Sequence, residues 1–266
     1  MNILDKIIAQ KQKEVAIAKE KNPIKNLEQS EFFNRVPFSF KQQLLDENKV
    51  GIIAEFKRKS PSKGIINATA DVQQTTLGYA NAGASTLSIL TDREFFGGTI
   101  DDVTAARKIN TIPILRKEFI IDEYQILEAK AIGADVILLL ANVLTPAQIK
   151  QFAKFAKSLG LEILLEIRDK EELPAINEYV DAVGVNNRNL KDFNVNLSQS
   201  FDLAPLIPNE FVKVSESGIG EAKTIHELKS AGYKGFLMGE TFMKQAQPEL
   251  ACAKFINEVK NYMLQS

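Results

Sequence analysis

The chain has 266 residues, of which 45% are hydrophobic and 25% are charged, as in a globular protein with a large core. Its 33 basic and 34 acidic side chains leave a formal charge of −1, which argues against a partner that is a nucleic acid or an acidic membrane. The longest evident apolar run, residues 136–141, is far shorter than the roughly 20 residues of a membrane span, and the first residues do not resemble a signal peptide, so we expect a cytoplasmic protein.

The N-terminal part of the sequence predicts helices that precede any strand. Residues 2–20 carry apolar positions at helical spacing among lysines and glutamates. Asn22 and Pro23 interrupt this pattern, and Ser39 can cap a second short helix before a strand begins at Val50. We therefore expect residues 1–48 to form an N-terminal helical extension.

From Val50 onward, short apolar runs alternate with helical segments. Strand-type runs occupy residues 50–57, 86–90, 112–117, 135–140, 162–166, 182–186, 211–215 and 235–239. Among the intervening segments, Thr145 with Gln148 and Asp169 with Glu172 fit capping-box helix starts. Eight such units predict an α/β protein with a (β/α)8 or TIM barrel, as one domain over residues 1–266. An open doubly wound sheet is the alternative, but no Gly-x-Gly-x-x-Gly follows the first strand.

Acid–base chemistry must fall to lysines and carboxylates. The only histidine, His226, lies in a helical pattern, and we expect it on a solvated helix face. The only cysteine, Cys252, lies in an apolar helical pattern and is expected to be a packing residue. No ligand cluster of the zinc type is present, so we expect no metal.

Polar residues gather where the predicted strands end, which in a (β/α)8 barrel is the mouth that holds the active site. Glu55 and Lys57 share one face of the first strand, because side chains alternate along a strand. The others at this end are Lys117, Glu166, Asn186, Arg188, Glu216 and Ser217. Each of these residues alone could be an ordinary polar residue at a strand exit, and we expect Arg58 and Lys59 to be ordinary solvated charges. The convergence of the other residues on one mouth favours an active site.

Two glycine-bearing turns, residues 215–220 and 236–241, follow the last two strands. In this architecture such turns and a short helix N-terminus commonly hold a phosphate, although two tight turns alone would also need glycine. The loop of residues 92–99 adds Phe95 and Phe96, which either form a wall for an aromatic substrate or pack beneath the loop. Its two glycines would let it move as a lid.

Five segments carry a resemblance to a known family. They are IAEFKRKSPS (53–62), LRKEFIIDEYQILEA (115–129), LLE (164–166), GVNNRNL (184–190) and SESGI (215–219). The chain resembles the indole-3-glycerol-phosphate synthase family of the tryptophan pathway over nearly its whole length. Glu118 stands where that family usually has aspartate, beside Lys117, and we expect this change to tune the site without loss of function.

The resemblance implies a (β/α)8 enzyme that closes a ring in 1-(2-carboxyphenylamino)-1-deoxyribulose 5-phosphate, with loss of carbon dioxide and then of water. It implies no redox cofactor and no metal. By similarity, Lys117 would be the general acid and Glu166 the general base. Lys57 would bind the substrate's anions and either stay a binding group or also donate a proton in the dehydration, with Glu55 keeping it charged.

The resemblance also implies a binding set around these catalytic residues. Substrate-binding residues would be Ser60, Phe96, Phe119, Leu138, Asn186, Arg188 and Glu216. Phosphate-binding residues would be Ser217, Gly218, Gly239 and Glu240, the last through its N–H because its carboxylate would repel a dianion.

Two other functions remain open from the residues alone. A sugar-phosphate isomerase or Schiff-base aldolase would use the same phosphate turns, but an aldolase needs a neutral lysine, whereas Lys57 and Lys117 beside Glu55 and Glu118 should stay charged. A catalytically silent sugar-phosphate-binding protein would not require Lys117 and Glu166 together. We expect a small anionic sugar-phosphate partner and a monomer or weak homo-oligomer; association with other tryptophan-pathway enzymes is left open.

Overall fold

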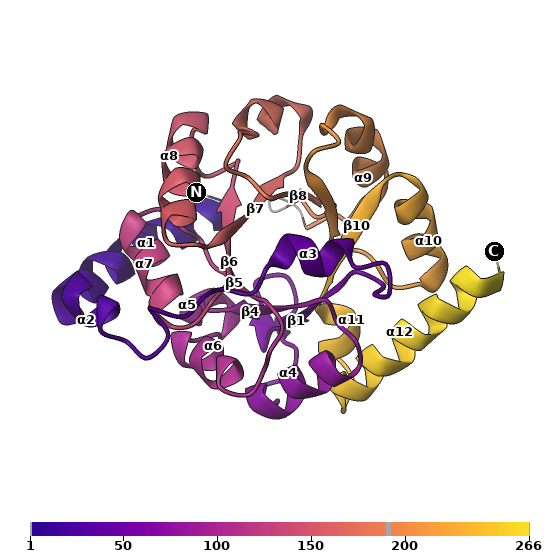
Figure 1. Cartoon of the computed structure of the whole chain (residues 1–266), viewed down its shortest axis with the longest axis horizontal. Coiled ribbons are helices and arrows are strands. Elements are labelled where there is room, and N and C mark those ends of the chain that lie inside the picture. Colours follow the sequence, from indigo (N-terminus) through magenta and orange to yellow (C-terminus); the bar gives the residue numbers. More distant parts are fainter. Residues whose placement is uncertain (1, 190–192, 266) are drawn as a thin grey trace.

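The computed structural model describes residues 2–189 and 193–265. Leu190, the last residue of the GVNNRNL segment that carries part of the family resemblance, lies outside these residues. Eight parallel strands close into a barrel in the order β1-β10-β9-β8-β7-β6-β5-β4. This confirms the (β/α)8 prediction over the open sheet (Figure 1). The barrel strands are β1 (Ile52–Phe56), β4 (Thr86–Leu90), β5 (Ile114–Lys117), β6 (Val136–Leu140), β7 (Glu162–Ile167), β8 (Ala182–Asn186), β9 (Val212–Glu216) and β10 (Tyr233–Met238).

Helices surround the barrel and fill the connections between its strands. The N-terminal ones are α1 (Ile3–Lys21), α2 (Ile24–Glu28) and α3 (Phe40–Leu45). The others are α4 (Val72–Asn81), α5 (Arg93–Phe96), α6 (Ile100–Arg107), α7 (Glu123–Ala131), α8 (Pro146–Ser158), η1 (Lys170–Ala175), α9 (Ser198–Leu203), η2 (Ala204–Leu206), α10 (Ala222–Ser230), α11 (Glu240–Met243) and α12 (Pro248–Gln265). None of the helices in the described part of the chain is long and apolar enough to cross a membrane.

The apolar core has two layers because strand side chains alternate between the barrel interior and the helices. On β1, Ile53 belongs to the interior layer, whereas Ile52 and Ala54 pack in the layer under the helices. Glu55 follows Ile53 on the inward face, and Lys57 follows Glu55. Alternation therefore aims both charged side chains into the mouth of the barrel, as the sequence predicted.

The N-terminal helices contact both ends of the barrel. Phe40 and Leu44 of α3 join the interior layer, and Ser39 donates a hydrogen bond to Glu162 at the start of β7, at 2.7 Å. In Figure 1, α3 accordingly lies across the middle of the barrel. Ile7 of α1 joins the same interior layer, but from the end where the strands finish. The extension thus closes the bottom of the barrel and reaches over its mouth.

Some local predictions were wrong. A short antiparallel hairpin, β2 (Lys59–Ser60) and β3 (Gly64–Ile65), follows β1 and was not predicted. Thr145 and Gln148 form the expected capping box, but Asp169 makes no side-chain cap and begins a 3₁₀ helix. The carboxylate of Glu172 instead accepts the N–H of Arg168 at 2.6 Å.

The two residues of unique type lie away from the barrel mouth. His226 is half-buried rather than solvated, because its ring packs against that of Tyr262 on α12 at 5.7 Å. Cys252 is fully buried, as expected of a packing residue, and burial raises the pKa of its thiol to about 12.

Candidate active site

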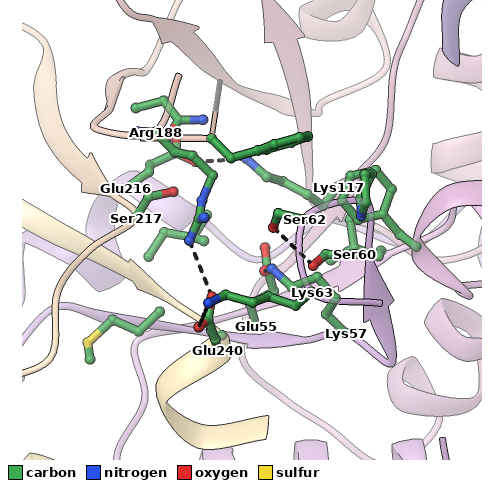
Figure 2. A pocket seen from close by; sticks show the side chains of 18 of the residues that line it. Glu55, Lys57, Ser60, Ser62, Lys63, Lys117, Arg188, Glu216, Ser217 and Glu240 are labelled. Atoms are coloured by element: carbon green, nitrogen blue, oxygen red, sulfur yellow. Dashed lines mark hydrogen bonds and ion pairs between the residues drawn. The ribbon is translucent and has the colours of Figure 1, made fainter. Parts of the chain in front are cut away.

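A cavity of about 590 Å³ opens where the barrel strands end. Side chains from different strands and loops point into it together (Figure 2). Every residue that the sequence predicted for the site lines this cavity: Glu55, Lys57, Ser60, Phe96, Lys117, Phe119, Leu138, Glu166, Asn186, Arg188, Glu216, Ser217, Gly218, Gly239 and Glu240. The structure therefore brings the predicted set together, while their individual roles stay predictions.

Lys57 and Glu55 form the pair predicted from strand alternation. The ammonium of Lys57 lies 2.6 Å from one carboxylate oxygen of Glu55. The other carboxylate oxygen accepts a hydrogen bond from Ser88 on β4, at 3.4 Å. Glu55 is buried and Lys57 is partly exposed to the cavity, so the carboxylate anchors a cation that a substrate can reach.

Lys117 sits between two carboxylates from the far side of the barrel. Its ammonium lies 2.9 Å from Glu166 on β7 and 2.7 Å from Glu216 on β9. Asn186 on β8 donates a hydrogen bond to the second oxygen of Glu166, at 2.9 Å. Glu118, which was expected to help keep Lys117 charged, does not do so. Consecutive residues point to opposite sides, and Glu118 instead contacts Lys11 at 3.0 Å.

The surroundings of this cluster shift the pKa values of Glu166 and Glu216 in opposite directions. Burial alone would lower the pKa of Lys117, but Glu166, Glu216 and Glu55 outweigh it, so the pKa lies above its usual value. Burial would raise the pKa of Glu166, but Lys117 and the hydrogen bond from Asn186 bring it below its usual value. Burial, with the charge of Glu166, raises the pKa of Glu216 to about 7 despite Lys117. At neutral pH one carboxyl is therefore ionised and the other is partly protonated.

The phosphate end is built by the turns after β9 and β10. Ser217 and Gly218 adopt positive φ of 70° and 78°, an arrangement that is rare for serine. Thr241 donates a hydrogen bond to the carbonyl of Ile219 at 3.0 Å, which joins the two turns. Gly239 caps the short helix α11, so the N–H groups of its first turn have no partner within the helix.

Arg188 reaches across this end to Glu240 on α11. Its guanidinium donates to the Glu240 carboxylate at 3.2 Å, and Lys63 lies 3.7 Å from the other carboxylate oxygen (Figure 2). The carboxylate that was expected to repel a phosphate is thus already paired with two cations. An incoming phosphate would compete with Glu240 for them.

The apolar end of the cavity combines barrel and N-terminal residues. The rings of Phe96 and Phe119 lie 6.0 Å apart, and Leu138 lines the same wall. The sequence left open whether Phe95 and Phe96 line the cavity or pack beneath the 92–99 loop. Phe96 lines the cavity, whereas Phe95 is half-buried and packs against the core. This end offers an apolar slot for a flat ring.

Sequence reasoning missed several residues of the cavity wall. Ile3, Leu4 and Ile7 of α1 line its apolar end, and Lys63 and Lys244 add cations at its rim. The helical spacing of the α1 residues was visible in the sequence, but nothing there indicated which surface they would cover. Lys63 directly follows IAEFKRKSPS (53–62), a segment that carries part of the family resemblance, and this position was the available signal.

Arg58 and Lys59 are not the ordinary solvated charges that were expected. Arg58 contacts both carboxylate oxygens of Asp102, at 2.7 and 2.9 Å, and lies over the ring of Phe56. Lys59 donates to the backbone carbonyl of Glu94. Arg58 thus ties the segment before the β2–β3 hairpin to α6, and Lys59 ties β2 to α5, at the rim of the mouth.

Sequence comparison relates the chain to known proteins over nearly its whole length. Residues 4–255 match the family model described as indole-3-glycerol phosphate synthase. The indole-3-glycerol phosphate synthase of Bacteroides thetaiotaomicron is 46% identical over 97% of this chain and 99% of its own, and that of Carboxydothermus hydrogenoformans is 39% identical over 92% and 96%.

Solved structures support the fold. The chain superposes on a chain of the tryptophan synthase a2b2 complex of Pyrococcus furiosus with a TM-score of 0.59 at 16% identity, over 80% of this chain and 98% of the other. At this identity the likeness concerns the barrel alone. The sequence matches carry the functional conclusion: the chain belongs to the indole-3-glycerol phosphate synthase family, the carboxy-lyases that form indole-3-glycerol phosphate in tryptophan biosynthesis.

Proposed function

We propose that Lys117 is the general acid of the ring closure. In this step the ring carbon that bears the substrate's carboxylate attacks the ribulose carbonyl, and the carbonyl oxygen must gain a proton as the carbon–carbon bond forms. The observation that carries the proposal is the position of Lys117, whose ammonium is held at 2.9 and 2.7 Å by Glu166 and Glu216. Both contacts keep it protonated and aim it into the cavity.

The later steps need one more acid and a base. Loss of carbon dioxide restores the aromatic ring, and the hydroxyl formed in the first step then leaves as water. We assign to Glu166, which is ionised at neutral pH, the removal of the proton whose loss completes the indole. Lys57 is the candidate acid for the departing hydroxyl, or it serves only to bind the substrate's anions; Glu55 at 2.6 Å orients it in either role.

The remaining cavity residues bind the ends of the substrate. Asn186 and Arg188, with Ser60, would hold the sugar hydroxyls and the carboxylate. The phosphate would accept hydrogen bonds from Ser217, Gly218, Gly239 and the N–H of Glu240. The aromatic ring would lie among Phe96, Phe119 and Leu138.

The charge state of the lysines argues against a Schiff-base mechanism on the same barrel. Such a mechanism needs a neutral amine, whereas both lysines lie within 3 Å of carboxylates and the pKa of Lys117 is raised. Borohydride in the presence of substrate should therefore trap no adduct, and a trapped lysine would reverse this assignment.

The test supplies the carboxyphenylamino-deoxyribulose phosphate and follows indole fluorescence, which the absence of tryptophan from the chain makes easy to see. Lys117→Met should lower kcat at least roughly 100-fold while the inhibition constant of inorganic phosphate stays within about threefold. Lys150→Met, on the exposed surface of α8, is the matched control. An active Lys117→Met enzyme would assign the acid to another group.

The charge of the substrate indicates the compartment in which the enzyme works. A phosphorylated anion does not cross a membrane unaided, so we propose that the enzyme works in the cytoplasm, where such a substrate is made. We further propose that residues 1–266 form one domain, since side chains of the 1–48 extension line the cavity, and that the chain is a monomer or weak homo-oligomer.

A further inference from the structure

Lys11 is a buried cation on α1 that the reaction does not use. Only 4% of its surface is exposed. Its ammonium lies 2.7 Å from Glu14, 3.1 Å from Asp92 and 3.0 Å from Glu118. Burial alone would lower the pKa of Lys11, but the charges of Glu118, Asp92 and Glu14 outweigh it and raise it, so the ammonium stays charged.

The two barrel carboxylates that meet Lys11 each fix one ring of the cavity wall. Asp92 accepts the N–H groups of Phe95 and Phe96, at 2.7 and 3.2 Å, and so caps the short helix that carries Phe96. Glu118 accepts the N–H of Phe119 at 2.8 Å. Its other oxygen accepts the hydroxyl of Thr91 at 2.7 Å. The backbone of both rings is therefore held by two carboxylates whose nearest cation is Lys11; Arg116 lies 4.0 Å from Glu118.

Lys11 also lies on the face of α1 that covers the mouth. Positions 4, 7 and 11 follow one another at helical spacing, and Leu4 and Ile7 line the cavity. An apolar helix face can slide over an apolar slot at little cost, whereas a buried ammonium between two fixed carboxylates permits one position only. The ion cluster thus sets where α1 sits.

We propose that Lys11 is a positioning residue of the active site, which fixes α1 over the mouth and holds the Phe96–Phe119 wall in place for the substrate's aromatic ring. The inference rests on the proposed location of that ring. It gives the N-terminal extension a part in the reaction beyond covering the barrel.

The test uses the full chain and separates positioning from folding. Lys11→Met removes the ammonium that contacts the buried Glu118 and Asp92 and leaves only Arg116, 4.0 Å from Glu118, so both the melting temperature and the activity should fall. Lys11→Met/Glu118→Gln removes one of the two buried carboxylate charges, while glutamine still accepts the N–H of Phe119. We expect the double variant to recover most of the melting temperature but to keep a KM at least tenfold above that of the wild type.

Inorganic phosphate serves as the probe of the opposite end of the cavity. Its inhibition constant should stay within about threefold of the wild-type value in both variants, because the phosphate turns lie outside the cluster. The control is Lys19→Met, on the same helix in an exposed pair with Asp122, and its KM should be unchanged. A KM that recovers together with the melting temperature in the double variant would reduce Lys11 to a stability residue and overturn the inference.

Leu138→Ala distinguishes this failure from a failure of the proposed function. A raised KM in Leu138→Ala with a normal KM in Lys11→Met would overturn the inference and leave the location of the ring intact. A normal KM in both variants would overturn both the inference about Lys11 and the proposed location of the aromatic ring.

Discussion

Gly184 on β8 provides a steric test of the catalytic cluster. A Cβ atom added there would lie 2.2 Å from Oε1 of Glu216 and 3.3 Å from a methyl of Leu164. Ordinary contact begins at 3.4 Å, so the carboxylate oxygen would have to move by 3.4 − 2.2, or about 1.2 Å. That carboxylate holds Lys117 through its other oxygen at 2.7 Å, and the displacement would reach the lysine directly.

A misplacement of about 1 Å near the chemistry costs on the order of 100-fold in rate, so Gly184→Ala should lower kcat/KM about that much. Overpacking should cost about 1–3 kcal/mol of unfolding free energy, which is roughly 2–4 °C of Tm per kcal/mol in a chain of this size. The assays are indole fluorescence under steady-state conditions and thermal melting by circular dichroism.

Lys254→Ala, on the exposed surface of α12 away from the cavity, is the control for this substitution. The side chain of Lys254 is 81% exposed and lies 3.8 Å from Glu258 in a surface pair, so kcat/KM and Tm of this variant should stay near wild type. Should Gly184→Ala retain kcat/KM within threefold of the control, the cluster tolerates the shift and the reasoning from the Glu216 position is refuted.

Two further predictions concern pH and stability. The pKa of Glu216 is raised from 4.5 to about 7, so its stabilising contribution is full below about pH 4.5 and is lost as pH rises through 7. Glu216→Gln should accordingly show a smaller fall in Tm from pH 5 to pH 8 than the wild type, and equal falls would contradict the shift. Asp135→Ala leaves the buried Arg107 without its partner at 2.8 Å, so urea unfolding should show a loss of about 3–5 kcal/mol, with kcat of the folded enzyme unchanged.

The barrel was predictable because its strands carry a strong local signal. Each is a short apolar run between helical segments, and the closed order of the strands follows from the right-handed connection of parallel neighbours. The strand ends observed at β1, β5 and β10 differ from the predicted ones by two residues at most. The location of the site followed from the barrel, since polar side chains at strand ends share one mouth.

Contacts between distant segments were not predictable in the same way. The sequence places Glu118 beside Lys117, but the alternation of side chains turns it away, and the true partners arrive from β7 and β9. Arg58 looked solvated because Asp102 is 44 positions away along the chain. The β2–β3 hairpin has two residues per strand, too few for any periodic signal.

The distribution of charge in the catalytic cluster affects how an anionic substrate is received. Three buried carboxyl groups, Glu55, Glu166 and Glu216, contact the ammonium groups of Lys57 and Lys117. If all three were ionised, this cluster alone would carry one more negative than positive charge beside the substrate's carboxylate. Because the pKa of Glu216 is raised to about 7, that group is partly protonated near neutral pH, which reduces the excess. Glu166, whose pKa lies below its usual value, then remains the ionised partner that holds Lys117 protonated.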